Sequence, residues 1–453
     1  MKIPESPPST TEIFERLIEA KDSQKLFNIF GANLGLTDSK SRYVHWEKLK
    51  HLTPPDGLSS EEYWYAVKSA RQKVYKHLTL KDELGQRFCF CIPDVLQMGL
   101  HWLDQNAAGS ITMNQPIANP HTRDTYLISS LIEESISSSQ LEGASTTRNV
   151  AKEMLRQGRP PKDHSEQMIF NNYKAMAVIR DYKHDDLTPS LIQHLHETLT
   201  KDTLDNPDKA GRYRDNSDDI HVIDASESQI LHTPPSADEL PRRVQEICDF
   251  ANNSSENEFI HPVIRAITLH FMIGYDHPFI DGNGRTARAL FYWAMAKHGY
   301  WLMEFVSISS IIKKAPAQYA KAYLHTETDG NDLTYFLIHQ MEVITEGVQS
   351  LHDYLGRKSS EIEEAEKLLD NSKARGQLNY RQLSLLKHAL KNPNAVYRIQ
   401  EHQASHAISY QTARTDLLKM SEKLGLLRKR KYGNSFVFIS PHDLKTRLIE
   451  NKL

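Results

Sequence analysis

The side chains that could do chemistry gather in one short stretch, HPFIDGNGRTAR, which runs from His277 to Arg288. Gly282, Asn283 and Gly284 permit positive φ and close approach of the backbone, so their N–H groups can converge on an anion. A helical pattern then begins at Thr286 and continues to residue 298. The N-terminus of that helix would add free N–H groups and its dipole at the same place. This arrangement predicts a phosphate site.

Charged side chains in the same stretch complete the predicted site. Asp281 can hold a divalent cation, Mg²⁺, that bridges phosphates. Arg285 and Arg288 supply charge-assisted hydrogen bonds to phosphate oxygens. His277 lies at the end of the preceding apolar helix, which Pro278 stops, and this position suits a general base. The combination predicts in-line attack of a hydroxyl on a phosphoryl centre, with the proton passing to His277.

The stretch resembles the signature of the Fic family, His-Pro-Phe-x-Asp-Gly-Asn-Gly-Arg-x-x-Arg, at every fixed position. The resemblance implies a helical catalytic domain, ATP as the donor, and transfer of AMP to a Tyr, Thr or Ser hydroxyl of a target protein. Doc-like kinases of this family differ in the glycine-arginine part of the motif. The intact Gly282 and Arg285 therefore favour adenylyl transfer over phosphorylation.

Two further segments resemble parts of Fic proteins that contact ATP. Two short β-prone runs on either side of residues 224–228 predict a hairpin. The resemblance makes this hairpin a flap, which lies over the nucleotide through Ile230, Leu231 and His232 and holds the target segment by strand pairing. Downstream, Tyr319 is the second of two positions that are tyrosines near the adenine in many relatives, whereas the first is Gln318 here.

A regulatory segment precedes the motif. Residues 124–141 show the apolar spacing of an amphipathic helix, and Gly143 suits the position after its end. Glu142 is then a carboxylate at the negative end of a helix dipole, where it should attract a cation. Ser138, Glu142 and Gly143 resemble the inhibitory motif of Fic proteins, (Ser/Thr)-x-x-x-Glu-(Gly/Asn). The resemblance implies that Glu142 pairs with Arg288 and inhibits the enzyme.

Composition limits the remaining functions. The chain has 453 residues, a formal net charge of −3 and three cysteines without metal-ligand spacing. The net charge argues against bulk coating of nucleic acid. An odd number of cysteines suits a reducing compartment, and neither a signal peptide nor an apolar run long enough to span a membrane is present. These features predict a cytoplasmic protein without a membrane partner, although export without an N-terminal signal stays open.

The predicted fold class is mainly α, with a Fic core, a small β-hairpin flap and a C-terminal winged helix-turn-helix. The expected divisions are a helical cap at 1–94, the Fic domain at 95–350 with its inhibitory helix at 124–143, a charged linker helix at 351–376 and the winged helix at 377–453.

The C-terminal segment resembles a winged helix-turn-helix because three helical patterns precede a basic hairpin. The start of its third helix, predicted over 409–424, and the basic hairpin would meet duplex DNA. The side chains assigned to DNA are Tyr410, Gln411, Arg414, Arg428, Lys429, Arg430 and Lys431. Winged helices also serve as protein-docking or dimer modules, so a docking role and a homodimer stay open.

Two other functions compete with AMP transfer. In the first, the protein is a DNA-binding regulator whose Fic domain senses nucleotide with little turnover, although such a sensor has no need of a base at His277. In the second, the protein is a de-AMPylating hydrolase in which Glu142 activates water.

Overall fold

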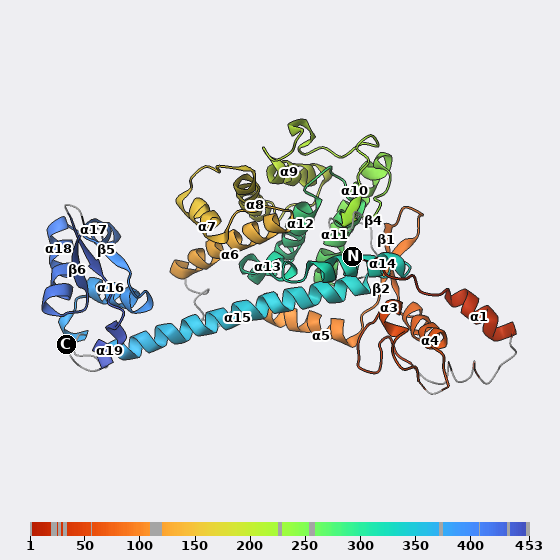
Figure 1. Cartoon of the computed structure of the whole chain (residues 1–453), viewed down its shortest axis with the longest axis horizontal. Helices are drawn as coiled ribbons and strands as arrows, with labels where there is room; N and C mark the ends of the chain where they lie inside the picture. Colours follow the sequence, from red (N-terminus) through yellow and green to blue (C-terminus); the bar gives the residue numbers. More distant parts are fainter. Residues whose placement is uncertain are drawn as a thin grey trace. The chain divides into compact units, whose positions relative to one another are not determined.

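The computed structural model describes residues 2–19, 25, 29, 34–55, 57–108, 120–224, 229–252, 259–370, 375–406, 408–432 and 435–449. The chain divides into two compact units, one of Met1–Ile111 with Pro120–Leu351 and one of Thr112–Asn119 with His352–Leu453. Helices make up most of each unit (Figure 1), so the mainly α fold class is confirmed. None of the described helices is both long and apolar enough to cross a bilayer.

The first unit holds most of the helices and two hairpins. Its elements are α1 (Thr10–Glu19), α3 (Trp46–Leu49), α4 (Ser60–Gln72), β1 (Lys76–Lys81), β2 (Arg87–Phe90), α5 (Asp94–Leu103), α6 (Pro120–Leu141), α7 (Arg148–Gln157), α8 (His164–Asp181), α9 (Pro189–Thr200), β3 (Val222–Asp224), β4 (Gln229–His232), α10 (Leu240–Ala251), α11 (Pro262–Asp276), α12 (Asn283–Lys297), α13 (Ile308–Ile312), α14 (Pro316–Thr328) and the first part of α15 (Thr334–Asp370).

Helix α11 is the centre of this unit. Its side chains are buried on almost every face, which is typical of a helix enclosed by others. Helix α12 packs along it, and α8, α9 and α10 contact one or the other. Gly274 allows α14 to approach, because a Cβ there would lie 2.4 Å from the hydroxyl oxygen of Tyr323. Two helix ends, the C-terminus of α11 and the N-terminus of α12, are therefore held together inside the core.

The N-terminal segment differs from the predicted helical cap. Strands β1 and β2 form an antiparallel hairpin within residues 1–94. Its turn depends on Asp82, whose Oδ1 accepts hydrogen bonds from the N–H groups of Leu84 and Gln86 at 2.9 and 2.7 Å. Gly85 takes a positive φ of 81° in the same turn. Side-chain capping of this kind stabilises a turn that helical periodicity does not reveal.

Several helix boundaries also differ from the prediction. Helix α6 begins at Pro120 rather than at residue 124. A separate linker helix over 351–376 was predicted, but α15 continues without interruption from Thr334 to Asp370. No proline occurs in this segment to break the helix. The sequence also predicts helices over 189–200 and 262–276, and the bounds of α9 and α11 confirm both.

The second unit combines short helices with a three-stranded antiparallel sheet of order β5-β7-β6. Its elements are α16 (Tyr380–Lys391), β5 (Val396–Arg398), α17 (Ile399–His406), α18 (Tyr410–Leu418), β6 (Arg428–Tyr432), β7 (Ser435–Ile439) and α19 (Leu444–Ile449). Helix α18 is shorter than predicted, since it passes into a π-helical turn at Lys419–Lys423. The core includes Leu386, Leu417, Met420, Leu426 and Phe438.

A buried carboxylate connects the helices of this second unit. Asp416 in α18 accepts hydrogen bonds from Arg381 Nε at 2.7 Å and from Asn379 Nδ2 at 2.9 Å, and His402 Nε2 lies 3.4 Å away. Only 5% of its side chain is exposed. The carboxylate therefore ties the start of α16 to the last turn of α18.

We predict that Asp416→Ala destabilises the second unit by about 1.5–3 kcal/mol, the usual contribution of hydrogen bonds to a charged group. Hydrogen exchange of the full-length chain should become faster in peptides from α16 to α18. Asp443→Ala is the control, because Asp443 also pairs with an arginine, Arg447, but its side chain is 47% exposed. Equal effects of the two substitutions would contradict a structural role for Asp416.

Candidate active site

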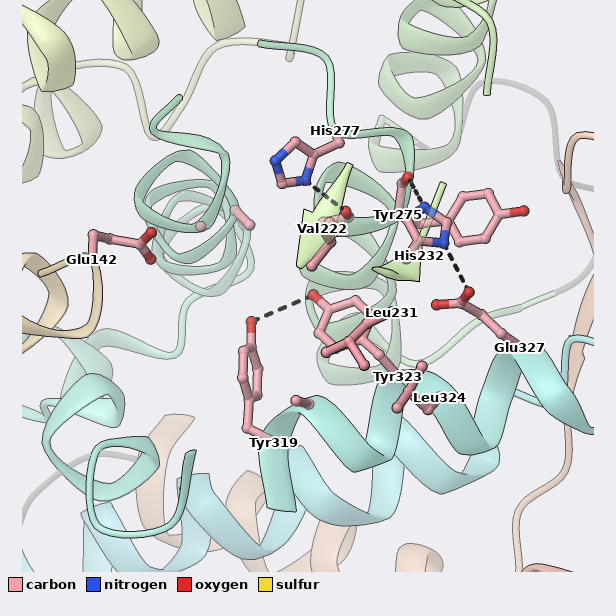
Figure 2. Close-up of a pocket in the computed structure, with 14 residues that line it drawn as sticks. Glu142, Val222, Leu231, His232, Tyr275, His277, Tyr319, Tyr323, Leu324 and Glu327 are labelled. Atoms are coloured by element: carbon pink, nitrogen blue, oxygen red, sulfur yellow. Dashed lines mark hydrogen bonds and ion pairs between the residues drawn. The ribbon is translucent and has the colours of Figure 1, made fainter. Parts of the chain in front are cut away.

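A cavity of about 200 Å³ lies beside the junction of α11 and α12. Figure 2 shows its walls, to which the end of α6, the flap strands, α11, α12 and α14 each contribute. Its lining residues are Glu142, Val222, Leu231, His232, Gly274, Tyr275, His277, Gly284, Ala287, Tyr319, Ala320, Tyr323, Leu324 and Glu327. Six of the residues predicted for catalysis, ATP binding or regulation meet here from distant parts of the chain: Glu142, Leu231, His232, His277, Gly284 and Tyr319.

His277 follows the last residue of α11 and takes the left-handed conformation, with φ 44° and ψ 56°. Such a backbone is strained in a residue other than glycine. The Nδ1 atom of its ring lies 3.3 Å from the carbonyl oxygen of Gly274. Because a carbonyl only accepts, Nδ1 carries the proton and Nε2 keeps its lone pair. Burial lowers the pKa of His277 to about 4, so the ring is neutral at pH 7 and can act as a base.

The predicted anion nest is in part the first turn of α12. The helix begins at Asn283, three residues before the predicted start. Of Gly282, Asn283 and Gly284, only Gly282 takes a positive φ, of 82°. Thr286 donates from its N–H and its Oγ1 to the Gly282 carbonyl, both at 2.9 Å. The side chain of Asn283 closes the preceding loop through two bonds to the backbone of Phe279. The predicted anion site is therefore the N-terminus of α12, and the loop before it is held in place by Asn283.

Arg285 does not line the cavity. Its buried guanidinium donates to Asp281 Oδ2 at 2.9 Å and to the carbonyl of Leu199 at 3.1 Å, and thereby holds the loop against α9. The side chain of Asp281 is 54% exposed, so its carboxylate is accessible to a hydrated cation. Asp281 thus fits the predicted role of a magnesium ligand, whereas Arg285 orients that ligand.

The predicted pair of Glu142 and Arg288 is present in the structure. Arg288 donates to Glu142 Oε1 at 2.8 Å, to Ser138 Oγ at 2.9 Å and to the Ser138 carbonyl at 3.0 Å. The side chain of Arg288 is 3% exposed and that of Glu142 is 26% exposed. Gly143 ends this segment with a positive φ of 95°. Bonds of this kind hold the guanidinium in one orientation.

Glu142 also lies against the start of α12. A Cβ at Gly284 would be 2.3 Å from Glu142 Oε1, so only glycine lets the carboxylate approach this closely. A carboxylate at a helix N-terminus takes the position that suits a phosphate. Figure 2 shows Glu142 on the side of the cavity opposite His232 and Glu327.

The flap residues are divided between the two faces of their hairpin. β3 pairs with β4, with Val222 opposite His232 and Ile223 opposite Ile230. Leu231 lines the cavity, whereas Ile230 does not line it and is 47% exposed. The structure therefore does not place Ile230 in the predicted ATP site. Both ring nitrogens of His232 already face protein acceptors, at 2.7 and 2.8 Å.

Tyr319 lies on the α14 wall of the cavity, as Figure 2 shows. Its hydroxyl lies 2.8 Å from His270 Nε2 and 3.4 Å from the hydroxyl of Tyr323. These partners fix the ring, so a planar ligand could pack on it. Gln318, in contrast, is exposed and does not line the cavity.

Sequence reasoning missed two residues that position the motif. His196 in α9 stacks on Phe279, with ring centroids 3.7 Å apart, accepts from Gly211 N–H at Nδ1 and donates from Nε2 to the Asp281 carbonyl. Arg214 donates from its Nε and Nη2 to the carbonyls of His277 and Asp276. Only the Arg-Tyr-Arg run that contains Arg214 gave any sequence signal, whereas His196 lies in an ordinary helical pattern.

His45, Glu47 and His325 form a second group whose atoms lie close enough together to ligate a metal. Other partners already use these atoms. His45 Nδ1 accepts from the N–H of Glu47 and caps α3. The ammonium of Lys321 lies 2.7 Å from the Glu47 carboxylate. The group is therefore accounted for by capping and ion pairing.

The residues predicted to bind DNA lie on α18 and β6. Tyr410, Gln411 and Arg414 are exposed on the first turns of α18. Strand β6 carries the four basic residues from Arg428 to Lys431 at an edge of the sheet. Two of the four have carboxylate partners, Lys429 with Glu422 at 2.7 Å and Arg428 with Asp443 at 3.5 Å.

Comparison with known proteins identifies relatives of the first unit. Residues 186–295 match the model of the Fic/DOC family. A protein adenylyltransferase Fic of Nematostella vectensis is 27% identical over 201 residues, which are 43% of this chain and 42% of that protein. The protein adenylyltransferase fic-1 of Caenorhabditis elegans is 26% identical over 184 residues, 39% of this chain and 33% of the relative.

Among solved structures, a Fic family protein from Desulfovibrio desulfuricans G20 aligns with 76% of this chain and 94% of its own, at 17% identity and a TM-score of 0.49. The matches to the two curated relatives span less than half of their length. The family match contains the whole motif from His277 to Arg288 and the flap strands. The chain therefore carries a domain of the Fic/DOC family, as the motif had indicated.

Proposed function

We propose that this protein is an adenylyltransferase that transfers AMP from ATP to a Tyr, Thr or Ser hydroxyl of a target protein. The observation that carries the proposal is the placement of a neutral His277, with its lone pair at Nε2, on the same cavity as the N-terminus of α12. A base and an anion site are thus adjacent. The curated relatives are themselves named protein adenylyltransferases.

The proposed step is an in-line displacement at the α-phosphorus. The target hydroxyl oxygen forms a bond to the α-phosphorus. At the same time the bond between the α-phosphorus and the oxygen that bridges to the β-phosphorus breaks. Pyrophosphate leaves with that oxygen, and the hydroxyl proton passes to Nε2 of His277. The first turn of α12 holds the phosphates and stabilises the charge that they carry. Asp281 would hold Mg²⁺, which supplies charge neutralisation of the phosphates when bound.

We predict that His277→Ala lowers the rate of AMP transfer by about 10²–10⁴-fold, the usual contribution of a general base. ATP binding should change little, because other groups hold the nucleotide. Incorporation of label from [α-³²P]ATP measures the rate, and calorimetry measures binding. His194→Ala, a histidine of α9 with a 50% exposed side chain, is the control. A rate above about a tenth of the wild-type value would contradict the assignment of His277 as the base.

The finer proposal is that Glu142 inhibits this enzyme. Its carboxylate lies on Gly284, at the position that suits a phosphate, and its bond to Arg288 holds the guanidinium away from a ligand. Because Arg288 is buried, the pair is less screened than a surface ion pair. Productive ATP binding would then require that the pair break and Arg288 turn to the γ-phosphate.

We predict that Glu142→Gly raises automodification at least about tenfold, which corresponds to about 1.4 kcal/mol. Glu142→Gln should also raise it, since charge holds Arg288. Arg288→Ala should not, because it removes the phosphate ligand as well. Intact mass after incubation with Mg-ATP counts the added AMP groups. Glu133→Gln is the matched control, because Glu133 lies in the same helix and pairs with Arg148 at 2.5 Å. Equal rates for wild type and Glu142→Gly would refute autoinhibition.

The same cavity favours one alternative activity. Glu142 and His277 both line it, so Glu142 could activate water against an AMP–protein bond. Release of AMP from a pre-labelled target, abolished in Glu142→Gln, would identify a de-AMPylating hydrolase. ATP binding without transfer in the Glu142→Gly variant would instead favour the nucleotide-sensor alternative. The predicted homodimer and cytoplasmic location stay predictions.

For the second unit we propose a winged helix that contacts duplex DNA. The supporting observation is the basic strand β6, which follows the exposed start of α18 in the chain, the order of a recognition helix and a wing. Charged residues also protect edge strands from aggregation, so the basic run alone does not require DNA. Docking of another protein is the alternative.

We predict that the full-length chain binds mixed-sequence duplex DNA at low salt and that affinity falls steeply as salt rises, because phosphate contacts release counterions. Arg414→Ala and Lys431→Ala should weaken binding and reduce the salt slope. Fluorescence anisotropy measures both quantities. Arg398→Ala is the control, since β5 lies at the other edge of the sheet. Absence of binding at low salt would favour protein docking.

A further inference from the structure

His232 has an unusual set of hydrogen-bond partners. Its Nδ1 lies 2.8 Å from Glu327 Oε2 in α14, and its Nε2 lies 2.7 Å from the carbonyl oxygen of Tyr275 in α11. Figure 2 shows both bonds, with the ring between the two helices. Only 9% of the His232 side chain is exposed. The imidazole therefore connects the flap strand β4 to two elements of the core.

The partners determine the protonation of the ring. A neutral imidazole has one N–H, whereas a carbonyl and a carboxylate both accept. Two satisfied bonds therefore require a proton on each nitrogen, with a negative charge on Glu327. Burial by itself lowers the pKa of His232, but the hydrogen bond and the charge of Glu327 outweigh it and raise that pKa above its usual value.

The hydrogen bond from His232 to the Tyr275 carbonyl stabilises the end of α11, the helix that His277 follows. The Tyr275 carbonyl is one of the last of α11, where the helix dipole is negative and a cation is stabilising. Arg214 donates to the carbonyls of the next two residues, Asp276 and His277. Two cationic side chains thus cover the end of α11 next to the predicted base.

The bond between His232 and Glu327 anchors the flap strand β4 to α14. A two-stranded hairpin has little stability by itself and needs packing or anchoring. In β4, Leu231 lines the cavity and His232 is the next residue. Fixing His232 to α14 and α11 therefore fixes the strand that forms one wall of the cavity.

We propose that His232, as an imidazolium paired with Glu327, is a positioning residue that clamps the flap to α14 and aligns the end of α11 that carries His277. Only the expected effect on the rate of AMP transfer rests on the proposed function. It replaces the predicted contact of His232 with ATP, because both ring nitrogens are occupied by protein partners.

The clamp depends on pH in one direction. Because the pKa of His232 is raised in the folded protein, the imidazolium is present at the usual histidine pKa of about 6.5 and is lost as pH rises through the raised pKa. The charged and titratable groups around the ring are Glu327, Tyr275, Asp276 and His277. Asp276 is already paired with Arg243 at 2.6 Å. Glu327 is therefore the partner that controls the proton.

The first test uses the full-length protein labelled with ¹⁵N-histidine and needs no enzymatic activity. At about pH 6.5, the usual histidine pKa, both ring nitrogens of His232 should give protonated signals, which are assigned by their loss in His232→Gln. In Glu327→Gln the amide can donate to a neutral ring, so one nitrogen should become unprotonated. An unprotonated His232 nitrogen in the wild type at this pH would overturn the proposal.

The second test separates positioning from nucleotide contact in the Glu142→Gly background. His232→Gln should lower the rate of AMP transfer by about 10²-fold, the effect of a small displacement of reacting groups, while the Kd of ATP changes less than about twofold. Glu327→Gln should keep the rate at about pH 6.5 and remove the fall in rate that loss of the imidazolium should cause in the parent at higher pH. His194→Gln, on the exposed side of α9, should match the parent. A weakened Kd with an unchanged rate would overturn the clamp. If no variant transfers AMP, the proposed function fails, and the ¹⁵N signals still decide the clamp.

Discussion

The structure depends on one junction, at which α11 ends and α12 begins. The free carbonyls of the first helix and the free N–H groups of the second lie within one short connection, so opposite ends of two helix dipoles face the same cavity. Arg214 and His232 donate hydrogen bonds to carbonyls at the end of α11, and the N-terminus of α12 is the proposed anion site. His277 lies between the two ends, where its strained backbone presents a neutral ring.

In the proposed mechanism two groups compete for the start of α12. The carboxylate of Glu142 lies against Gly284 there, and the proposal places a phosphate of ATP at the same helix end. Glu142 is on the chain already, at the end of α6, so it needs no association step. The hydrogen bond from Arg288 also stabilises the Glu142 carboxylate in this position. The proposed inhibition and the proposed substrate binding would therefore both depend on the N-terminus of α12.

Several polar side chains of the motif are used for structure. Asn283 closes the loop on Phe279, and Arg285 is buried between Asp281 and α9. His196 stabilises the same loop by stacking on Phe279 and by two hydrogen bonds. A loop that must hold a base and an anion site in fixed relation needs such bonds, because its backbone groups lack the regular partners of a helix or sheet.

The sequence alone determined the features that depend on neighbours in the chain. The motif from His277 to Arg288 follows from a specific signature, and the pair of Glu142 with Arg288 was implied by the resemblance to Fic proteins. Only the tertiary structure decided that Arg285 is buried, that Ile230 faces away from the cavity and that His232 pairs with Glu327, 95 residues later in the chain. The physical reason is that burial and hydrogen-bond partners depend on which helices pack together, and this information is spread over the whole chain.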